Sequence, residues 1–393
     1  MPRERVGDSR AAKPDRAVLG YTAGVTSHVR LRYPGRSAVS HVRIERGSLA
    51  RLGTFTRSTA GARRAVVVSD ARVASLYAAA ALRSLRHAGL GGDLLVVPAG
   101  ERSKSPQRLA RLWEALASLE LTRRDALVAL GGGVVGDLAG FAAATFLRGL
   151  PWICVPTTVL AQVDSSVGGK TAIDLAAGKN LAGAFHQPAG VLIDPDTLAT
   201  LAPRQRRAGL AEVVKIGMAV DAALFRWTER HVAELSAGSA GALAEAVVRA
   251  VRVKARVVTA DEREREGGRR TALNYGHTIA HAIEAARAYR GILHGEAVAI
   301  GMRAAGDLSV ALAGLSGDAR ARQDAVLDRL GLPVRMPPRT PLARLLEALA
   351  RDKKRASSGP RWVLTTRVGH ASVPRLISGR LVRSALLQAG AEA

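Results

Sequence analysis

The order of strand-like and helix-like segments changes near residue 200, and this change narrows the possible folds more than any other feature. Before it, stretches of helical periodicity alternate with short apolar runs at 65–69, 93–98, 126–130, 152–156 and 191–194. Such alternation predicts parallel βαβ units with right-handed crossovers. After it, helical segments follow one another at 203–220, 241–260, 278–288, 297–313, 323–330 and 341–350. We therefore predict an α/β half with a parallel sheet, followed by a mainly helical half.

This pattern divides the chain into three parts. We expect residues 1–37 to be a loose basic N-terminal extension, residues 38–200 an α/β domain and residues 201–393 a mainly helical domain. With 393 residues, the chain is long enough to bury an ample core.

Cysteine content and hydropathy indicate the cellular compartment of such a chain. Its single cysteine, Cys154, excludes an internal disulfide framework and suits a reducing compartment. The sequence has no apolar run of about eighteen residues that could span a membrane. Its first residues lack the apolar segment of a secretory signal. We expect a cytoplasmic protein with no membrane partner.

A formal net charge of +25 is the one argument for nucleic-acid binding. Only 8 of the 58 basic residues are lysines, and the chain has just two asparagines, a bias typical of a GC-rich coding background. The lysine positions are then informative, because arginine cannot replace lysine at every site. The sequence shows no stacking aromatic pattern and no nucleic-acid-binding module, so we expect no nucleic-acid partner.

A glycine-rich motif, Gly131-Gly132-Gly133-Val134-Val135-Gly136-Asp137, lies between the predicted strand 126–130 and a helix. It satisfies G-x-G-x-x-G, in which glycines let the backbone approach a diphosphate at a helix N-terminus. The acid that usually ends the next strand is missing, since that strand ends at Pro156-Thr157-Thr158. The motif predicts a nucleotide-type loop that departs from the usual dinucleotide fingerprint; tight strand–helix packing is the competing interpretation.

A second glycine-rich stretch runs from Asp164 to Thr171 and is followed by Gly178-Lys179-Asn180. Lys170 and Lys179 each stand beside a glycine, which suits binding of phosphate or another polar oxygen. The stretch resembles the end of a P-loop, but Asp164 occupies the first glycine position, which disfavours a P-loop NTPase. Loop lysines are usually only solvated, yet two of the eight lysines lie close together here.

Glu212 and Lys215 lie three residues apart, on one face of a predicted helix. A surface ion pair is the ordinary interpretation of this spacing. The flanking residues are apolar, however, so this face is enclosed, and enclosed charges require partners or a function.

Three histidines follow beside asparagine and glycine. His277 and His281 are four residues apart at a predicted helix start, and His294 follows a loop. A carboxylate with two imidazoles and an open position is typical of a catalytic metal site. Glu212 could combine with His277 and His294, or with a pair that includes His281, and the spacing does not choose between them.

Taken together, the motifs resemble the 3-dehydroquinate synthase family of sugar phosphate cyclases. The matching strings are GGGVVGDLAGFAAATFLRG, VPTTVLAQVDSSVGGKTAID, GKNLAGAFHQP, GLAEVVKIG, LNYGHTIAHAIE, LHGEAVAIGM and RDKK. With the strand pattern, the resemblance covers roughly residues 40–370. It implies a Rossmann-like NAD-binding domain, a mainly helical metal-binding domain and an active site between them, in a homodimer.

The resemblance also implies the reaction. The family converts the sugar phosphate 3-deoxy-D-arabino-heptulosonate 7-phosphate to 3-dehydroquinate and phosphate in the shikimate pathway, where aromatic amino acid biosynthesis begins. NAD oxidises the substrate transiently, phosphate leaves, hydride returns, and an aldol step closes the ring. Such a highly charged anion needs a cage of lysines and arginines, and a metal acidifies the hydroxyl group that loses hydride.

Site residues follow from the resemblance, motif by motif. It implies as metal ligands, around zinc or cobalt, Glu212, His277 and His294. It implies as NAD contacts Asp70, Glu101, Lys104, Gly133, Val134, Val135, Gly136, Asp137, Thr157, Thr158, Lys170, Lys179, Thr197, Leu198, Ala199 and Thr200. It implies as substrate and catalytic groups Arg148, Asp164, Lys170, Asn180, Lys215, Lys254, Arg270, Asn274, His281, Lys353 and Lys354.

The sequence departs from the family pattern in several places. The acidic run 261–266 looks two residues longer than usual, which lengthens the loop that carries Arg270. Ala280 stands where glycine is usual, and Ala99 where an acid is common. Residues 1–37 have no clear family counterpart.

Two other enzyme classes share parts of the pattern. Sister cyclases that form amino-dehydroquinate, 2-deoxy-scyllo-inosose or valiolone-type rings are the nearest, but Lys215, Lys254 and Asn274 fit dehydroquinate synthase. A metal-dependent polyol dehydrogenase of related fold does not explain the phosphate-directed lysines.

Overall fold

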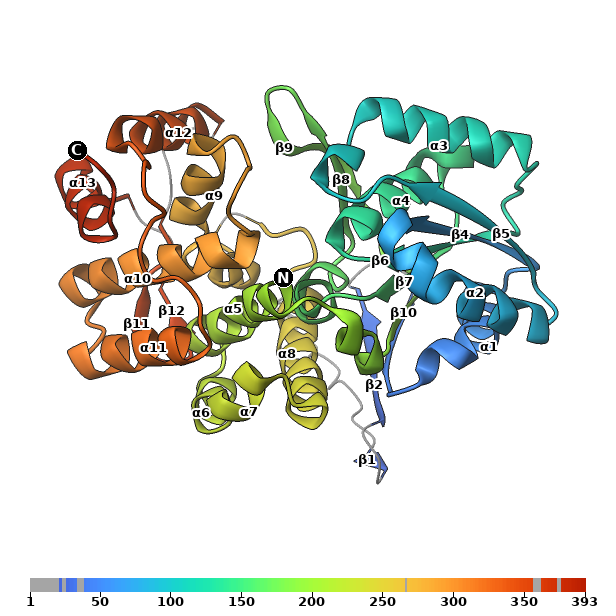
Figure 1. Cartoon of the computed structure of the whole chain (residues 1–393), viewed down its shortest axis with the longest axis horizontal. Helices are drawn as coiled ribbons and strands as arrows, with labels where there is room; N and C mark the ends of the chain where they lie inside the picture. The colour runs from blue at the N-terminus through green and yellow to red at the C-terminus, as the bar shows by residue number, and fades with distance from the viewer. Residues whose placement is uncertain (1–20, 23–25, 34–38, 266, 356–361, 373–375) are drawn as a thin grey trace, which may run out of the picture.

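The computed structural model describes residues 21–22, 26–33, 39–265, 267–355, 362–372 and 376–393, without the side chains of 21–22 and 351–355. It shows an α/β half and a helical half side by side, with the sheet on the right of Figure 1 and α9 to α13 on the left.

The α/β half is built on an eight-stranded sheet. Its strands are, in spatial order, β1 (Tyr21–Thr22), β2 (Thr26–Arg32), β3 (Val39–Ile44), β10 (Gly190–Ile193), β7 (Trp152–Pro156), β6 (Ala126–Gly131), β4 (Arg64–Asp70) and β5 (Gly91–Val97). All neighbours from β3 to β5 run parallel, whereas β1 and β2 add antiparallel strands at one edge. The chain passes from β4 out to β5 and returns to β6 on the other side of β4. This switch point, where parallel sheets bind ligands, lies at the carboxyl ends of β4 and β6.

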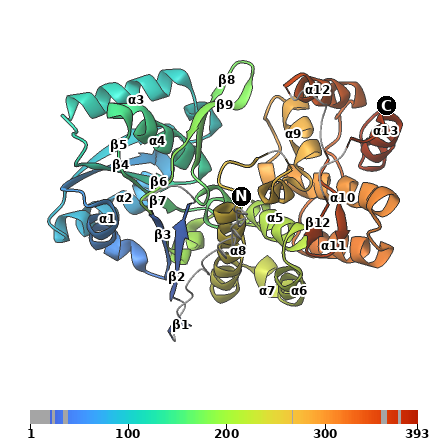
Figure 2. The ribbon, with the colours of Figure 1, turned by 180° about the vertical axis from the view of Figure 1, so that it is seen from behind.

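Helices cover both faces of this sheet, which explains why its inner strands are short apolar runs. Val67 in β4 packs under α1 (Leu52–Ala60) and α2 (Ala71–His87). Val66 and Val68 point to the opposite face, under α3 (Pro106–Ser118) and α4 (Gly133–Thr145). Figure 2 shows the sheet between these two helical layers from behind.

The helical half surrounds α5. Its elements are α5 (Pro203–Ala219), α6 (Ala222–Arg230), α7 (Val232–Ala237), α8 (Ala240–Ala260), α9 (His277–Ala286), α10 (His294–Ala313), α11 (Gly317–Arg329), α12 (Leu342–Arg355), α13 (Gly379–Gln388) and a small sheet of β11 (Thr365–Arg367) and β12 (His370–Ala371). Helices α6, α8, α10 and α11 all pack on α5. No helix in the described ranges is both long enough and apolar enough to cross a membrane.

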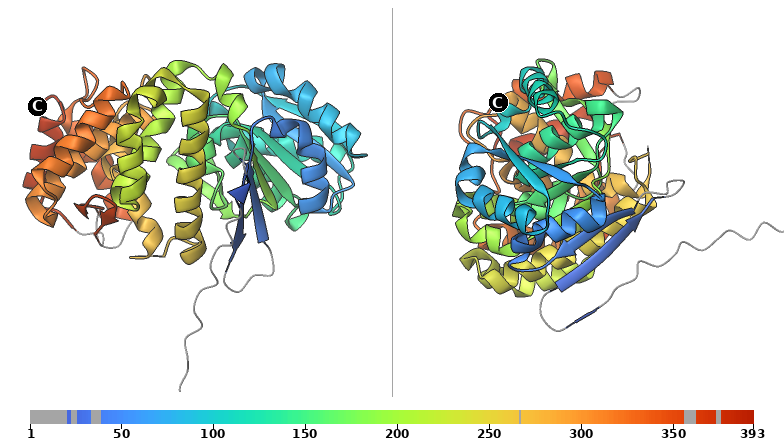
Figure 3. Two further views of the ribbon diagram at one scale, coloured as in Figure 1. Left: turned by 90° about the horizontal axis from the view of Figure 1, so that it is seen from below. Right: turned by 90° about the vertical axis from the view of Figure 1, so that its right-hand side faces the viewer.

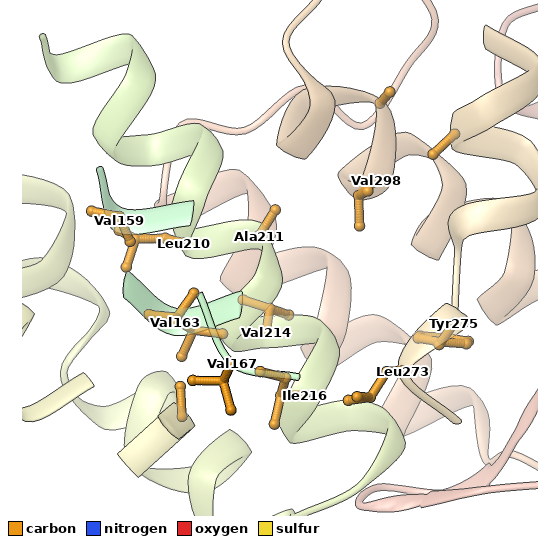
Figure 4. Close-up of a cluster of buried hydrophobic side chains, with 14 of the residues drawn as sticks. Val159, Val163, Val167, Leu210, Ala211, Val214, Ile216, Leu273, Tyr275 and Val298 are labelled. Atoms are coloured by element: carbon orange, nitrogen blue, oxygen red, sulfur yellow. The ribbon is translucent and has the colours of Figure 1, made fainter. Parts of the chain in front are cut away.

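Helix α5 is buried almost all round, from Ala208 to Ala219. Figure 4 shows apolar side chains around it, among them Val163 from the short π-helix after β7 and Val298 from α10. The two halves share this core, because α8 contacts both β2 and the π-helix η4 (Ala161–Ser165). The left view of Figure 3 shows the yellow α8 beside the blue strands of the sheet edge.

A hairpin stands apart from the main sheet. Strands β8 (Lys170–Leu175) and β9 (Gly178–Phe185) pair antiparallel with each other, and the hairpin packs on α4. Its tip projects toward α9 and α12 (Figure 1).

The five strands and six helices expected from the sequence are present, with ends shifted by up to six residues, the most at the start of α11. The expected loose extension is wrong for Thr26–Arg32, which form β2 in the sheet. Val29 and Leu31 are buried there, but His28, Arg30 and Arg32 on the other face gave the segment a polar appearance. Most of the rest of that extension, 1–20, 23–25 and 34–37, lies outside the described residues.

Candidate active site

Three side chains converge where α5, α9 and α10 meet. Glu212 lies within α5, while His277 and His294 are the first residues of α9 and α10. Glu212 Oε1 is 3.8 Å from Nε2 of His277 and 3.6 Å from Nε2 of His294. The structure thus brings together the three residues that the resemblance implied as metal ligands, within 4.8 Å of one another.

The surroundings of Glu212 fit a bound cation. The residue is 0% exposed, and among the described residues its Oε1 atom has no hydrogen-bond partner, which is costly for a buried carboxylate. A tetrahedral zinc ion bound at about 2.1 Å would hold its ligand atoms about 3.4 Å apart, close to the 3.8 and 3.6 Å between Glu212 Oε1 and the two Nε2 atoms. One carboxylate and two imidazoles suit zinc or a similar ion and leave a coordination position open.

The remaining ring nitrogens of both histidines face acceptors. Nδ1 of His277 lies 3.4 Å from the carbonyl oxygen of Tyr275, and Nδ1 of His294 lies 3.3 Å from Glu284 Oε2. An acceptor that takes the Nδ1 hydrogen leaves Nε2 free for a metal. Burial and the charge of Lys215 lower the pKa of His277 well below its usual value, so this ring is neutral, as a ligand must be.

His294 and Glu284 shift each other's titration. Burial alone would lower the pKa of His294, but the hydrogen bond and charge of Glu284, with the charge of Glu212, raise it. Burial alone would raise the pKa of Glu284, but His294 and Lys179 lower it to about 2. Glu284 is therefore a carboxylate throughout the neutral range.

Two glycines let α10 approach its neighbours closely enough to align the ligands. A Cβ atom on Gly295 would lie 1.7 Å from the carbonyl oxygen of Ala208 in α5. A Cβ atom on Gly301 would lie 2.1 Å from the carbonyl oxygen of Gly276, the residue before α9. The backbone contacts at both points hold Glu212, His277 and His294 at their observed spacing.

Gly295→Ala should therefore separate α10 from α5. The added methyl group meets backbone rather than a flexible side chain, so we expect a loss of about 2–3 kcal/mol in the free energy of unfolding, together with weaker zinc binding. Urea denaturation and zinc titration measure the two effects. Gly241→Ala is the matched control, because a Cβ atom there meets nothing within 4 Å. Equal stability of the two variants would show that α10 does not depend on this contact.

A buried group of charges lies beside the ligands. Lys215 is 1% exposed and forms an ion pair with Glu212. Burial would lower the pKa of Lys215, but Asp164 and Glu212 raise it, so Lys215 is a cation. Asp164 Oδ1 lies 2.5 Å from Nζ of Lys254. Burial would raise the pKa of Asp164, but the charges of Lys215 and Lys254 hold it below its usual range.

Hydrogen bonds made by Arg270 and Asp261 hold the long loop before Arg270 in place. The Asp261 carboxylate accepts from the backbone N–H groups of Arg265 and Arg270, at 3.0 and 3.2 Å. The Arg270 guanidinium donates to the carbonyl groups of Glu262 and Gly168. Arg270 is thus buried in a defined position, although the loop is longer than the family pattern suggests.

The same loop brings Glu264 to two predicted substrate residues. Asn274 Nδ2 donates to Glu264 Oε1 at 2.5 Å, and Lys170 pairs with Glu264 Oε2. Glu264 has a φ of 51°, in the left-handed region that non-glycine residues rarely adopt. Its carboxylate was not among the predicted site residues.

The glycine-rich motif lies at the switch point of the sheet. Gly131 ends β6 and Gly133 begins α4, whose N-terminus has no side-chain cap and so can bind an anion. Asp70 is the last residue of the neighbouring strand, β4, and its side chain caps α2 by accepting from the N–H groups of Arg72 and Val73. Thr157 and Thr158 follow β7, and Thr197 to Thr200 follow β10 in η5 (Pro195–Thr200), so all these groups share the carboxyl edge.

Lys104 joins this edge to the hairpin. Its Nζ atom lies 2.7 Å from Asp137 Oδ2 and 2.5 Å from Asn180 Oδ1, and the residue is 4% exposed. Asn180 adopts a φ of 55° in β9. Nζ of the adjacent Lys179 lies 3.2 Å from Glu101 Oε1, which Lys104 also approaches, and 3.5 Å from Glu284 Oε1.

Some predicted residues lie elsewhere. Arg148 is exposed beyond the C-terminal end of α4, a 13-residue helix that is about 20 Å long, while the motif glycines lie at its N-terminal end. Lys353 and Lys354 lie in α12, and their side chains are outside the described part. His281 lies next to the cluster, with its ring centroid 5.4 Å from that of His277, but outside the ligand triad.

Fold and site together define a class of two-domain enzymes with a Rossmann-like sheet and a helical metal centre. Two solved structures share the fold at high similarity. The 2-epi-5-epi-valiolone synthase ValA of Streptomyces hygroscopicus, with NAD+ and Zn2+ bound, is 30% identical, with a TM-score of 0.82 over 91% of this chain and 98% of that one. A 2-deoxy-scyllo-inosose synthase, complexed with carbaglucose-6-phosphate, NAD+ and Co2+, is 26% identical, with a TM-score of 0.84 over 92% and 99%.

Within this class, the chain belongs to the 3-dehydroquinate synthase family. Residues 94–208 match the 3-dehydroquinate synthase N-terminal family model, and residues 209–355 match the C-terminal one. The 3-dehydroquinate synthase of Pelobacter propionicus is 47% identical over 339 residues, which cover 86% of this chain and 94% of the relative.

Proposed function

We propose that the chain is a 3-dehydroquinate synthase, a lyase that converts 3-deoxy-D-arabino-heptulosonate 7-phosphate to 3-dehydroquinate and phosphate, with NAD and zinc or cobalt as cofactors. The convergence of Glu212, His277 and His294 beside buried lysines carries this proposal. Identity of 47% to a dehydroquinate synthase, against 30% and 26% to the two sister cyclases, favours this substrate over theirs.

Each group has a task that follows from its chemistry. A metal bound by the triad would polarise a substrate hydroxyl group and lower its pKa. Lys215 and Lys254 place positive charge beside that position, where they bind an anionic substrate. His281, whose ring stacks on that of His294 and meets that of His277 edge-on, would move a proton at the substrate.

The sheet side would hold the dinucleotide. The uncapped N-terminus of α4 suits the NAD diphosphate. Glu101, Lys104 and Asp137 form a charged group beside it that suits the polar atoms of the cofactor. Lys179 pairs with Glu101 of this group and with Glu284, which lies next to His294. The nicotinamide end of the cofactor would therefore lie toward the metal ligands.

The position of Arg148 supports a homodimer. Arg148 is exposed and lies at the end of α4 opposite the motif, where it could serve the substrate site of a second copy of the chain. The exposed Leu147 beside it, with a φ of 49°, suits a contact between copies. A buried, unpaired Cys154 is consistent with a cytoplasmic enzyme.

A turnover assay tests the proposal. Zinc-loaded, NAD-replete protein is given the heptulosonate phosphate, and phosphate release is followed with and without a chelator. We expect release that stops when the metal is removed. If the zinc- and NAD-loaded protein released no phosphate, the proposed activity would be wrong.

Substrate binding should weaken above about pH 8. Burial, partly offset by Asp164, lowers the pKa of Lys254 to about 8, so this lysine is cationic at pH 7 and loses its charge as the pH rises through 8. We expect KM for the substrate to rise between pH 7 and pH 9 in the wild type and to stay flat in Lys254→Arg, whose guanidinium keeps its proton. The same slope in both proteins would exclude Lys254 as its source.

A further inference from the structure

Glu284 is a buried carboxylate with two partners from different parts of the molecule. It lies in α9 and is 4% exposed. Its Oε2 atom is 3.3 Å from Nδ1 of His294, and its Oε1 atom is 3.5 Å from Nζ of Lys179. Each oxygen of one carboxylate therefore has its own partner.

Lys179 belongs to the other half of the molecule. It lies in β9 of the hairpin, whose tip projects toward α9 (Figure 1). Its Nζ atom is also 3.2 Å from Glu101 Oε1 on the sheet side and 4.7 Å from the ring centroid of Tyr289, just after α9. One lysine thus bridges an acid of the α/β half and an acid of the helical half.

The orientation of the His294 ring depends on Glu284. An imidazole can turn about its last side-chain bond, and only one ring orientation directs Nε2 toward Glu212. A carboxylate fixed opposite Nδ1 selects that orientation and tautomer before a metal arrives. Glu284 is itself fixed by its charge pair with Lys179 and by burial, so the chain of contacts runs from Glu101 to Glu212.

We propose that Glu284 is a positioning residue for the metal ligand His294, and that its pair with Lys179 links the hairpin of the α/β half to the metal site. This inference rests on the metal centre of the proposed function. Linkage is reciprocal. If the hairpin helps to fix the ligand, a metal that fixes the ligand must also hold the hairpin in place.

Zinc affinity tests the first part. Glu284→Ala removes the acceptor for Nδ1, and we expect zinc to bind about 10- to 100-fold more weakly, as when other partners of this kind are lost. Glu284→Gln keeps an acceptor oxygen but not the charge, and it should recover most of that loss. The control is Glu229→Gln, which removes a charge paired with Arg322 elsewhere in the helical half and should leave zinc affinity unchanged.

Hydrogen exchange of the hairpin amides tests the second part. In the wild type, saturating zinc should slow exchange across 171–185 by at least about fivefold, the lower end of typical coupling between sites. In Lys179→Met and in Glu284→Gln, zinc should leave these rates unchanged, because the charge pair is gone. Circular dichroism confirms that each variant is folded.

The outcomes separate this inference from the proposed function. A wild-type protein that binds no zinc contradicts both. Zinc binding that is unaffected by Glu284→Ala overturns the positioning role alone. Hairpin protection that responds to zinc equally in wild type and Lys179→Met overturns the link between the halves.

Discussion

Replacement of His277 by alanine should abolish stoichiometric zinc binding. The substitution removes one of three ligands and leaves Glu212 Oε1 facing His294 alone. Loss of an outer partner already weakens metal binding about 10- to 100-fold, so loss of a ligand should exceed a hundredfold. Metal content after dialysis measures this directly, and phosphate release should fall with it.

His231→Ala is the matched control for that experiment. His231 also lies in the helical half, where it stacks on Trp227 with ring centroids 4.5 Å apart, and it has no part in the site. This variant should retain its zinc. A His277→Ala protein that keeps a full equivalent of zinc would show that the ligand set is wrong.

Replacement of Lys215 by methionine should leave zinc bound but reduce turnover by about 100- to 1,000-fold, the usual effect of removing one preorganised electrostatic group. Methionine retains much of the shape of the buried side chain but removes the charge beside Glu212 and Asp164. Zinc content and phosphate release are measured on the same preparation, so that the two effects are separated.

The control for Lys215→Met must also remove a cation from a group of acids. Arg320→Met does so, because Arg320 pairs with Asp307 and Asp324 away from the site. It should lower stability without lowering turnover per folded molecule. Full activity in Lys215→Met would exclude any role of that lysine in the reaction.

The main architecture could be predicted because its signals are local. Short apolar runs flanked by helical periodicity, such as Ala126–Gly131 of β6, form the inner strands of the sheet. β2 was missed because charged residues alternate with its buried ones and it lies at the edge. The hairpin was also missed, because two glycines and two alanines give Gly178–Phe185 little strand character, and lysine and aspartate interrupt the short run Lys170–Leu175.

The part of the candidate site that lies within recognisable sequence motifs could be predicted. Glu212, His277 and His294 were named from strings of sequence, and the structure brings their ligand atoms together. Glu284 was not named, although it stands seven residues after His277 on the same helix face, a spacing that could have indicated it. Glu264 could not be placed, because the position of a residue in a lengthened loop depends on tertiary contacts.

The origin of the three ligands in three separate helices has a consequence for folding. An unfolded chain cannot hold them together, so a metal that binds them favours only the folded state. A thousandfold excess of free metal over its dissociation constant would add about 4 kcal/mol to the stability of the native chain. Metal supply then governs more than the rate of reaction: a molecule deprived of zinc unfolds more often and meets proteases more often.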